Sequence, residues 1–332
     1  MFKTLNGRSG ATFFLSCASR DAWRKSLEFY RSDSFFTRLK KRLLAGAWPW
    51  IRLTATCDAG AAEKRIADDF GTSIPNGLDD DCSAMISMTR DKVVIHYHGR
   101  GYLKIAMGDS KPGVAAEVAV YRFLAEKQPR LFSFSAVDAD SVAESDHSVR
   151  FFMNYASGQY SVTPVDIEEL LPPLCELFRL VPRESRPWGE LWRSLDLPQL
   201  TERLPEGYAE GSTPVGMVHR DFKPWNVKSG ARPLLYDFES VSFAGCPLED
   251  FFNYLVDPLL HRKRFREAAE VVSSGRYRRL AESLLTDFGI PSSEICRYWC
   301  WYLLERVVFW RRNKQPEFAE YFVAIYETFS KN

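Results

Sequence analysis

One short stretch, residues 219–226, constrains the fold of this chain more than any other. It reads His-Arg-Asp-Phe-Lys-Pro-Trp-Asn, and an Asp-Phe-Glu triplet begins at Asp237, eleven residues after its last member. Strand-like segments at 216–218 and 234–236 flank the stretch. The pattern therefore predicts a loop between two short buried strands.

The residue types in this loop are those that phosphoryl transfer requires. An aspartate such as Asp221 accepts a proton from an attacking hydroxyl, while an asparagine and a second aspartate, here Asn226 and Asp237, hold magnesium. The metal neutralises charge on the nucleotide phosphates. A single His-x-Asp would be compatible with chance, but the complete set in this order favours a catalytic loop.

Length and composition indicate a folded chain with two parts. The 332 residues are 45% apolar and 14% aromatic, which allows two domains with separate cores. The formal net charge of +1 gives no strong overall field, so we expect no nucleic-acid partner. No apolar run approaches the roughly 18 residues of a membrane span, and seven cysteines without a Cys-x-x-Cys spacing favour a reducing cytoplasm.

Residues 1–80 are predicted to be a basic and aromatic extension packed on the part of the chain that carries the 219–226 loop. Residues 11–18 are expected to form a buried strand, and 20–52 contain nine Lys or Arg against three Asp or Glu. Within them, 35–44 would form a helix with one apolar face. Two interpretations stay open: a packed helix with a solvated basic rim, or an interfacial helix attracted to anionic lipid at the inner membrane face.

Residues 81–157 are predicted to form a small antiparallel-sheet domain. Strands at 82–89, 92–98 and 102–107 form a meander, followed by a helix at 114–127 and a strand at 149–155. Residues 158–332 are predicted to form a mainly helical domain that carries the catalytic loop at 217–239. Its expected helices are short and broken at 167–204, and long at 247–255, 264–288, 292–314 and 317–329.

The sheet domain contains a candidate nucleotide site. Lys104 lies in mid-strand, where its ammonium could reach nucleotide phosphates, and Glu117 lies on the following helix, where it could pair with the lysine. The first turn has no Gly-x-Gly-x-x-Gly and reads Ser-Met-Thr-Arg-Asp-Lys over 87–92. If this turn binds nucleotide, Thr89, Arg90 and backbone N–H groups must substitute for glycine.

With these residues identified, 82–330 resemble the aminoglycoside phosphotransferase and choline kinase-like family, a branch of the protein-kinase-like fold. The resemblance rests on His-x-Asp-x-x-Pro-Trp-Asn at 219–226 and on Asp-Phe-Glu from Asp237, followed by Gly-x-Pro-Leu-x-Asp ending at Asp250. Parts of both motifs are similar to family members that accompany bacterial surface-polysaccharide genes. The His-Arg-Asp-Phe-Lys-Pro portion is similar instead to the Ser/Thr protein-kinase loop.

The resemblance implies a bilobal α+β fold, with an antiparallel-sheet N-lobe, a mainly helical C-lobe and an extra N-terminal segment. It implies an ATP- and Mg²⁺-dependent kinase in which Asp221 is the base, Asn226 and Asp237 hold the metal, and Glu117 holds Lys104 against the phosphates.

Further roles follow from the same resemblance. Lys223 would stabilise charge at the γ-phosphate. Asp250 would be buried and accept hydrogen bonds from the loop backbone, since a buried charge without such partners would be costly. His219 would pack and hydrogen-bond within the loop.

The acceptor hydroxyl is left open among several hypotheses. The chain ends in Phe-Ser-Lys-Asn and its 261–279 segment is Arg-rich, which disfavours a polycationic aminoglycoside. We expect a carbohydrate or a lipid-linked glycan as the acceptor, with peripheral membrane contact through 20–52. The alternatives are a Ser/Thr protein kinase, an aminoglycoside- or choline-type kinase, and a pseudokinase scaffold, which the missing glycine-rich turn would suit.

Overall fold

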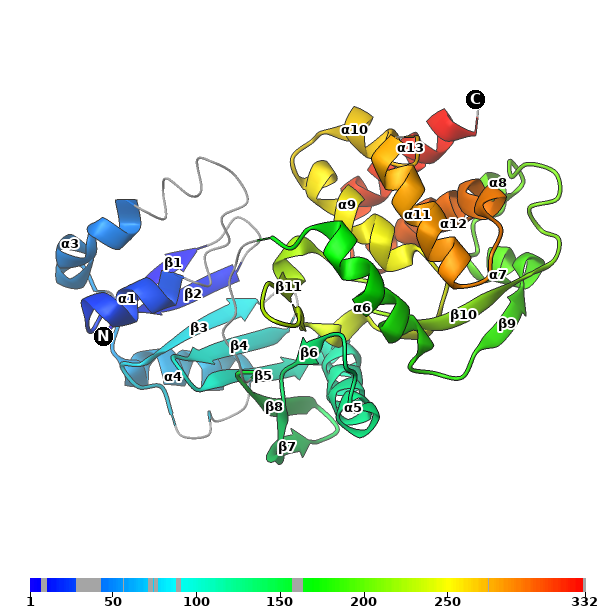
Figure 1. Ribbon diagram of the computed structural model, residues 1–332. Helices are drawn as coiled ribbons and strands as arrows, with labels where there is room; N and C mark the ends of the chain where they lie inside the picture. The colour runs from blue at the N-terminus through cyan, green and yellow to red at the C-terminus, as the bar shows by residue number, and fades with distance from the viewer. Residues whose placement is uncertain are drawn as a thin grey trace. The chain divides into compact units, whose positions relative to one another are not determined.

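A computed structural model describes residues 1–6, 11–27, 43–55, 57–70, 74, 77–87, 91–156, 164–273 and 275–330. The chain divides into two compact units (Figure 1). The sheet unit comprises Met1–Arg122 and Ser135–Ser157, and the helical unit comprises Phe123–Phe134 and Gly158–Asn332. Helix α5 (Lys111–Lys127) begins in the first and ends in the second.

The sheet unit is built on a seven-stranded antiparallel sheet. Its spatial order is β1 (Phe2–Asn6), β2 (Ala11–Ser16), β3 (Cys82–Ser87), β4 (Lys92–Tyr97), β5 (Gly101–Met107), β8 (Ser148–Asn154) and β7 (Val137–Glu144). The predicted meander, the strand at 149–155 and the strand at 11–18 are confirmed. The sequence pattern did not predict β1, or that β2 pairs with β3 through Thr12 and Ile86. Strands β1 and β2 therefore extend the sheet of the predicted meander.

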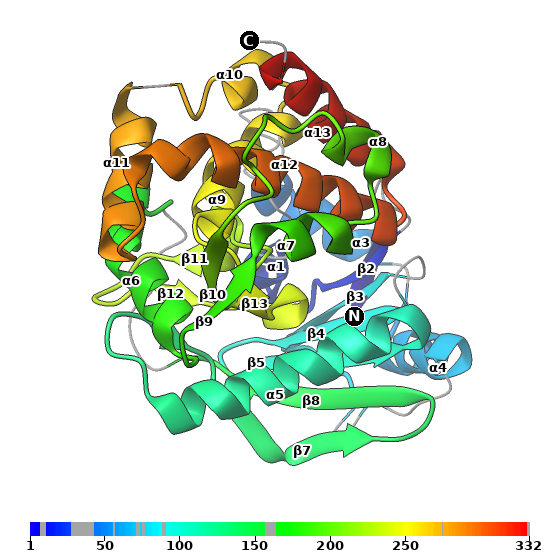
Figure 2. The same cartoon turned by 90° about the vertical axis from the view of Figure 1, so that its right-hand side faces the viewer.

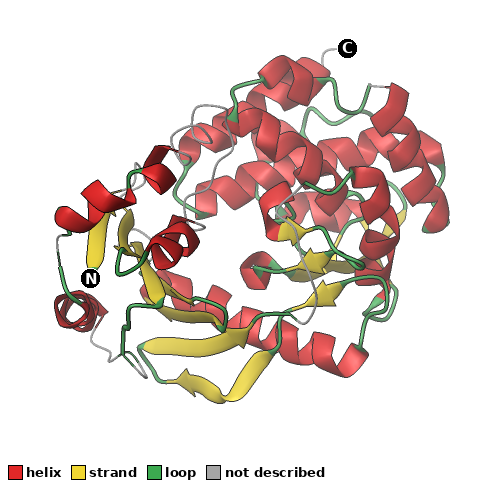
Figure 3. Ribbon diagram, turned by 60° about the vertical axis from the view of Figure 1, so that its left-hand side comes forward, coloured by secondary structure: helices red, strands yellow, loops and turns green. Residues whose placement is uncertain are grey.

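Helices α1 (Arg20–Ser26), α3 (Trp48–Leu53) and α4 (Ala59–Phe70) belong to the same unit (Figure 3). Helix α4 covers the sheet with Ala62, Ile66 and Phe70, which repeat every four residues and therefore share one face. Trp23 of α1 lies in a second cluster, where Trp48 and other partly buried residues pack. Most of the helix predicted at 35–44 falls outside the described residues.

The helical unit contains eight α-helices within its described residues (Figure 2). They are α6 (Ile167–Arg179), α7 (Trp188–Ser194), α8 (Pro198–Thr201), α9 (Glu249–His261), α10 (Phe265–Ala269), α11 (Gly275–Asp287), α12 (Ile295–Arg312) and α13 (Pro316–Phe329). Two predictions were wrong in detail. The helix expected at 264–288 is two helices, α10 and α11, and the second begins at Gly275, a residue type that disfavours the interior of a helix. Helix α6 continues through Pro172 and Pro173 because its apolar face, including Leu170 and Leu174, is buried.

Two small sheets hold the catalytic loop in the helical unit. Strand β10 (Ser212–Val218) lies between β9 (Glu184–Pro187) and β13 (Ser242–Gly245), and β12 (Leu234–Leu235) lies between β11 (Val227–Lys228) and β6 (Ser133–Phe134). A Cβ atom at Gly245 would lie 2.0 Å from the Val218 side chain, so the pairing of β13 with β10 requires glycine at this position. The loop 219–226 therefore starts from a closely packed strand.

Helix α12 is buried on nearly all sides. Its buried residues include the aromatic core residues Trp299 and Tyr302 and also two charged residues, Glu305 and Arg306. Charged side chains are rarely buried unless they are paired, so their position indicates specific partners. Among the helices of the described residues, none combines the length and apolar character needed to cross a membrane.

Candidate active site

Helix α9 holds the backbone of the catalytic loop through Asp250. The Asp250 carboxylate accepts hydrogen bonds from the backbone N–H of His219 at 2.7 Å and from that of Arg220 at 2.8 Å. Arg220 has a φ of +62°, a left-handed conformation that is unfavourable for a non-glycine residue. The structure thus gives Asp250 the position that the motif predicted, and its two hydrogen bonds stabilise an otherwise strained turn.

The carbonyl of Arg220 is also held by hydrogen bonds. It accepts hydrogen bonds from Asn253 Nδ2 and from Arg306 Nη1, each at 2.7 Å. The Arg220 guanidinium forms an ion pair with Glu305. Helices α9 and α12 therefore determine the conformation of the loop on both sides of Arg220.

Burial changes the titration of Asp250. Removal from water raises the pKa of this carboxyl to about 6, against the opposing effects of His219 and the two backbone hydrogen bonds. At neutral pH Asp250 is still mostly ionised, which is the form that accepts both N–H groups.

Two side chains of the loop converge on the Asp221 carboxylate, those of Lys223 and Asn226. The ammonium of Lys223 lies 2.5 Å from one carboxylate oxygen of Asp221. The side-chain amide of Asn226 donates to the other oxygen at 2.9 Å and to the Asp221 carbonyl at 2.8 Å. Asp221 is partly exposed, with 22% of its side chain accessible, whereas only 6% of the Lys223 side chain is. The Asp221 carboxylate is therefore partly accessible and is held by a cation and an amide.

Asn226 and Asp237 are brought to the same end of a hairpin. Strands β11 and β12 pair Val227 with Leu235, and the N–H of Tyr236 donates to the Asn226 carbonyl at 3.3 Å. Asp237, the next residue, has a φ of +70°. The Asn226 Oδ1 atom is buried and accepts no hydrogen bond from the described residues. An amide oxygen and a carboxylate are ligands suited to Mg²⁺, so these two residues fit the metal that the motif implies.

His219 has a packing position. Its Nε2 lies 2.9 Å from the Tyr236 carbonyl, and its ring lies 4.6 Å from that of Phe238. The side chain is fully buried. These contacts place His219 beneath the loop as a support, and they give it no access to a substrate.

The sheet unit brings Lys104 and Glu117 together. Lys104 on β5 donates to both oxygens of Glu117 on α5, at 2.9 and 2.7 Å. Both side chains are buried. Because a buried ion pair stabilises a fold little more than apolar residues would, its presence favours a functional role. Thr89 and Arg90 lie outside the described residues.

The motifs did not identify Asn253, Asp257, Glu305 or Arg306. Asp257 accompanies Lys223, with the Lys223 Nζ atom 3.2 Å from an Asp257 carboxylate oxygen. The sequence contained one indication of these residues: they are polar or charged positions within the mainly apolar helices α9 and α12. Hydrophobic periodicity does not predict which charged residue of a helix is buried or which residues it contacts.

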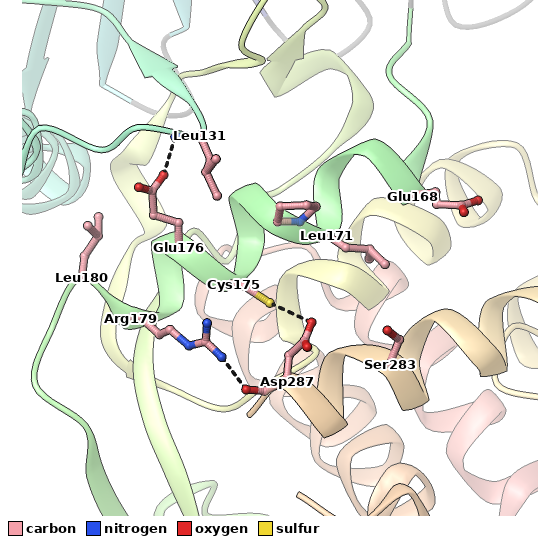
Figure 4. Close-up of a pocket in the computed structure, with 10 residues that line it drawn as sticks. Leu131, Glu168, Leu171, Cys175, Glu176, Arg179, Leu180, Ser283 and Asp287 are labelled. Atoms are coloured by element: carbon pink, nitrogen blue, oxygen red, sulfur yellow. Dashed lines mark hydrogen bonds between the residues drawn. The ribbon is translucent and has the colours of Figure 1, made fainter. Parts of the chain in front are cut away.

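A separate concave region of the helical unit lies between α6 and α11 (Figure 4). Two of its charged side chains already have partners: Glu176 accepts from the N–H groups of Arg130 and Leu131, and Arg179 donates to the Asp287 carbonyl. Burial raises the pKa of the Cys175 thiol to about 11, so this cysteine is not a reactive thiolate. We assign the region to packing between the two helices.

Comparison with known proteins reveals distant structural likenesses. No protein-family model matches the chain, and no curated protein matches it. The chain is similar to a thermostable mutant of aminoglycoside phosphotransferase APH(4)-Ia in ternary complex with AMP-PNP and hygromycin B. The identity is 14% and the TM-score 0.45, over 82% of this chain and 98% of that chain.

Two further structures show a similar degree of likeness. A choline/ethanolamine kinase family protein from Mesorhizobium loti is 16% identical, with a TM-score of 0.43 over 73% of this chain and 84% of that chain. Macrolide 2′-phosphotransferase MphH from Brachybacterium faecium is 15% identical, with a TM-score of 0.42 over 81% of this chain and 97% of that chain. Because these likenesses are distant, the function proposed below rests on this chain's own residues.

Proposed function

We propose that this chain is an ATP-dependent phosphotransferase that moves the γ-phosphate to a hydroxyl of a carbohydrate or a lipid-linked glycan. The observation that carries the proposal is the convergence on Asp221, where the Lys223 ammonium lies at 2.5 Å and the Asn226 amide at 2.9 Å. A carboxylate held in this way can accept a proton, and the neighbouring cation can stabilise negative charge on a phosphoryl group.

The reaction assigns one role to each group. The acceptor oxygen forms a bond to the γ-phosphorus, the bond to the β–γ bridging oxygen breaks, ADP leaves, and the hydroxyl proton passes to Asp221. Lys223 stabilises charge on the transferred group. Lys104, oriented by Glu117, neutralises the other nucleotide phosphates. Mg²⁺, which Asn226 and Asp237 would hold, supplies further charge neutralisation when bound.

The acceptor is proposed to be neutral or anionic. Residues 261–279 contain seven Lys or Arg and two Glu, so this part of the helical unit would repel a polycation. A sugar hydroxyl or the end of a lipid-linked glycan fits this charge better than an aminoglycoside does.

A phosphate-transfer screen tests the proposal. Unmodified chain, Mg²⁺ and γ-labelled ATP are incubated with neutral sugars, a glycolipid extract, aminoglycosides, choline and a generic protein substrate. We expect label in a carbohydrate or glycolipid fraction. Transfer to protein alone would instead establish a protein kinase, and the absence of transfer to any acceptor would contradict the proposal.

Asp237→Ala tests the metal assignment. Mg²⁺ with ATP is expected to raise the melting temperature of the unmodified chain by on the order of 5 °C at saturating ligand. The variant should lose this shift because it lacks a carboxylate ligand for the metal. Glu327→Gln, which changes an exposed carboxylate in a surface ion pair with Arg203, is the matched control. An undiminished shift in Asp237→Ala would exclude this residue as a ligand.

Membrane contact is proposed for one exposed apolar edge of the sheet unit, composed of Leu43, Trp50 and Leu53. Their exposed fractions are 66%, 74% and 79%. Trp48, on the opposite side of α3, is anchored by a hydrogen bond from its Nε1 to the Cys17 carbonyl. Exposed cations among the described residues of the same unit include Arg52 on α3 and Arg20 and Arg24 on α1. Exposed apolar side chains and cations on one unit suit the interface of an anionic bilayer.

Sedimentation with phosphatidylglycerol-containing vesicles tests this contact. Trp50→Ser combined with Leu53→Ser is expected to lower the partition coefficient about tenfold or more, because two large apolar side chains no longer enter the interface. Leu131→Ser, at a position 46% exposed in the helical unit, should not change it. Equal partitioning of the double variant and the unmodified chain would reject the contact.

A further inference from the structure

Asp257 is a buried carboxylate on α9 that no sequence motif assigns. Only 1% of its side chain is exposed, and one of its oxygens lies 3.2 Å from Lys223 Nζ. Lys223 therefore contacts two carboxylates, Asp221 in its own loop and Asp257 in the supporting helix.

The charge of Asp257 is balanced by cations. Neither of its oxygens has a hydrogen-bond partner of ordinary geometry in the described part of the chain, although the Tyr302 hydroxyl on α12 lies near enough to interact with this carboxylate. Arg306 Nη2 lies 3.9 Å from the oxygen that Lys223 also faces. A buried carboxylate without hydrogen bonds is costly unless charges compensate it, and Lys223 supplies the shorter of these two ion pairs.

Asp257 also belongs to a regular set on α9. Asp250, Asn253 and Asp257 are spaced by three and four residues, so they lie along one face of the helix. Asp250 binds the N–H groups at the start of the loop, and Asn253 binds the Arg220 carbonyl. Asp257 continues this face and contacts a side chain of the loop, the ammonium of Lys223.

We propose that Asp257 is a positioning residue for Lys223. Its carboxylate holds the Lys223 ammonium beside Asp221 before nucleotide binds, so that the cation is in place for the incoming γ-phosphate. Arg306 lies 3.9 Å from Asp257 and also donates to the Arg220 carbonyl at 2.7 Å, which links this carboxylate to the loop backbone. The inference rests on the proposed phosphotransferase function for its kinetic consequence, but not for the contact itself.

A double-mutant cycle in kcat tests the kinetic consequence. Asp257→Asn is expected to lower kcat about 10- to 100-fold, the size of effect caused by a displacement of roughly 1 Å, while KM for ATP changes less than threefold. In a Lys223→Met background, the same substitution should cause no further loss, because its effect acts through Lys223. Equal losses of kcat in both backgrounds, or a change confined to KM, would overturn the proposal.

The same four proteins, compared by melting temperature, test the contact without any activity. Asp257→Asn should be less stable than the unmodified chain, and the loss should be smaller when Lys223 is already Met. If Asp257→Asn alone does not fold, folding of the double variant would support the coupling between Asp257 and Lys223. Equal losses of melting temperature in the unmodified and Lys223→Met backgrounds would overturn this coupling. If the unmodified chain transfers no phosphate, the proposed function fails, but this cycle still decides whether the two side chains are coupled. Glu327→Gln is the control for both cycles.

Discussion

Asp221→Asn is expected to lower kcat by about 10²- to 10⁴-fold, the contribution typical of a positioned general base. Asparagine has nearly the same shape as aspartate, so the amide of Asn226 can still donate to its remaining oxygen. The variant should therefore keep this hydrogen bond while losing the ability to accept the proton and the ion pair with Lys223. Single-turnover transfer of γ-labelled phosphate measures the chemical step directly.

Nucleotide affinity separates this role from a structural one. Mg²⁺-ATP should bind Asp221→Asn with a Kd within about threefold of the unmodified value by calorimetry, since the residues assigned to the phosphates and the metal are intact. Glu327→Gln should retain full activity. Turnover of Asp221→Asn near the unmodified rate would remove Asp221 as the base, and a parallel loss of nucleotide binding would make it a structural residue.

Asp250→Ala is expected to have the largest effect on stability. The substitution leaves the buried N–H groups of His219 and Arg220 without acceptors, at about 1–3 kcal/mol each. It also removes the contact that holds Arg220 in its left-handed conformation. We therefore expect the free energy of unfolding to fall by about 2–6 kcal/mol. We also expect a large loss of kcat, because Asp221 directly follows Arg220 and would move with it.

The pH dependence of Asp250→Asn provides a second measurement. Below pH ~4, Asp250 is protonated in both the folded and the unfolded chain. Between pH ~4 and ~6 the unfolded chain loses this proton, whereas the folded chain keeps it because burial raises the folded pKa to about 6. Its contribution to the free energy of unfolding therefore decreases by up to about 3 kcal/mol across this window and stays constant above it.

Urea unfolding at pH 4.5 and pH 7 checks this sign. Relative to the unmodified chain, Asp250→Asn should show a smaller decrease in stability from the lower to the higher pH, because asparagine does not titrate. Asp287→Asn, at another carboxylate of the helical unit, is the control. An identical pH dependence in Asp250→Asn and the unmodified chain would mean that Asp250 is not the group that titrates near pH 6.

Local sequence was sufficient for the meander and for the motif around Asp221. The meander at 82–107 alternates in the way that half-buried strands do, and its turns are short. Long-range pairing was not predictable in the same way. Nothing in the alternation of residues 11–16 shows that they add to β3, which is more than 60 residues away, and their pairing required the tertiary structure.

At the candidate site, too, the sequence determines local spacing and the tertiary structure determines long-range contacts. The order and spacing of Asp221, Lys223, Asn226 and Asp237 are given by the covalent chain. The sequence by itself therefore determined the set of groups on which the proposed phosphoryl transfer rests. A hydrogen bond or ion pair to a distant helix depends on how two elements pack. The tertiary structure therefore decided that one face of α9 supports the loop and that Asp257 lies against Lys223, because only folding brings residue 257 beside residue 223.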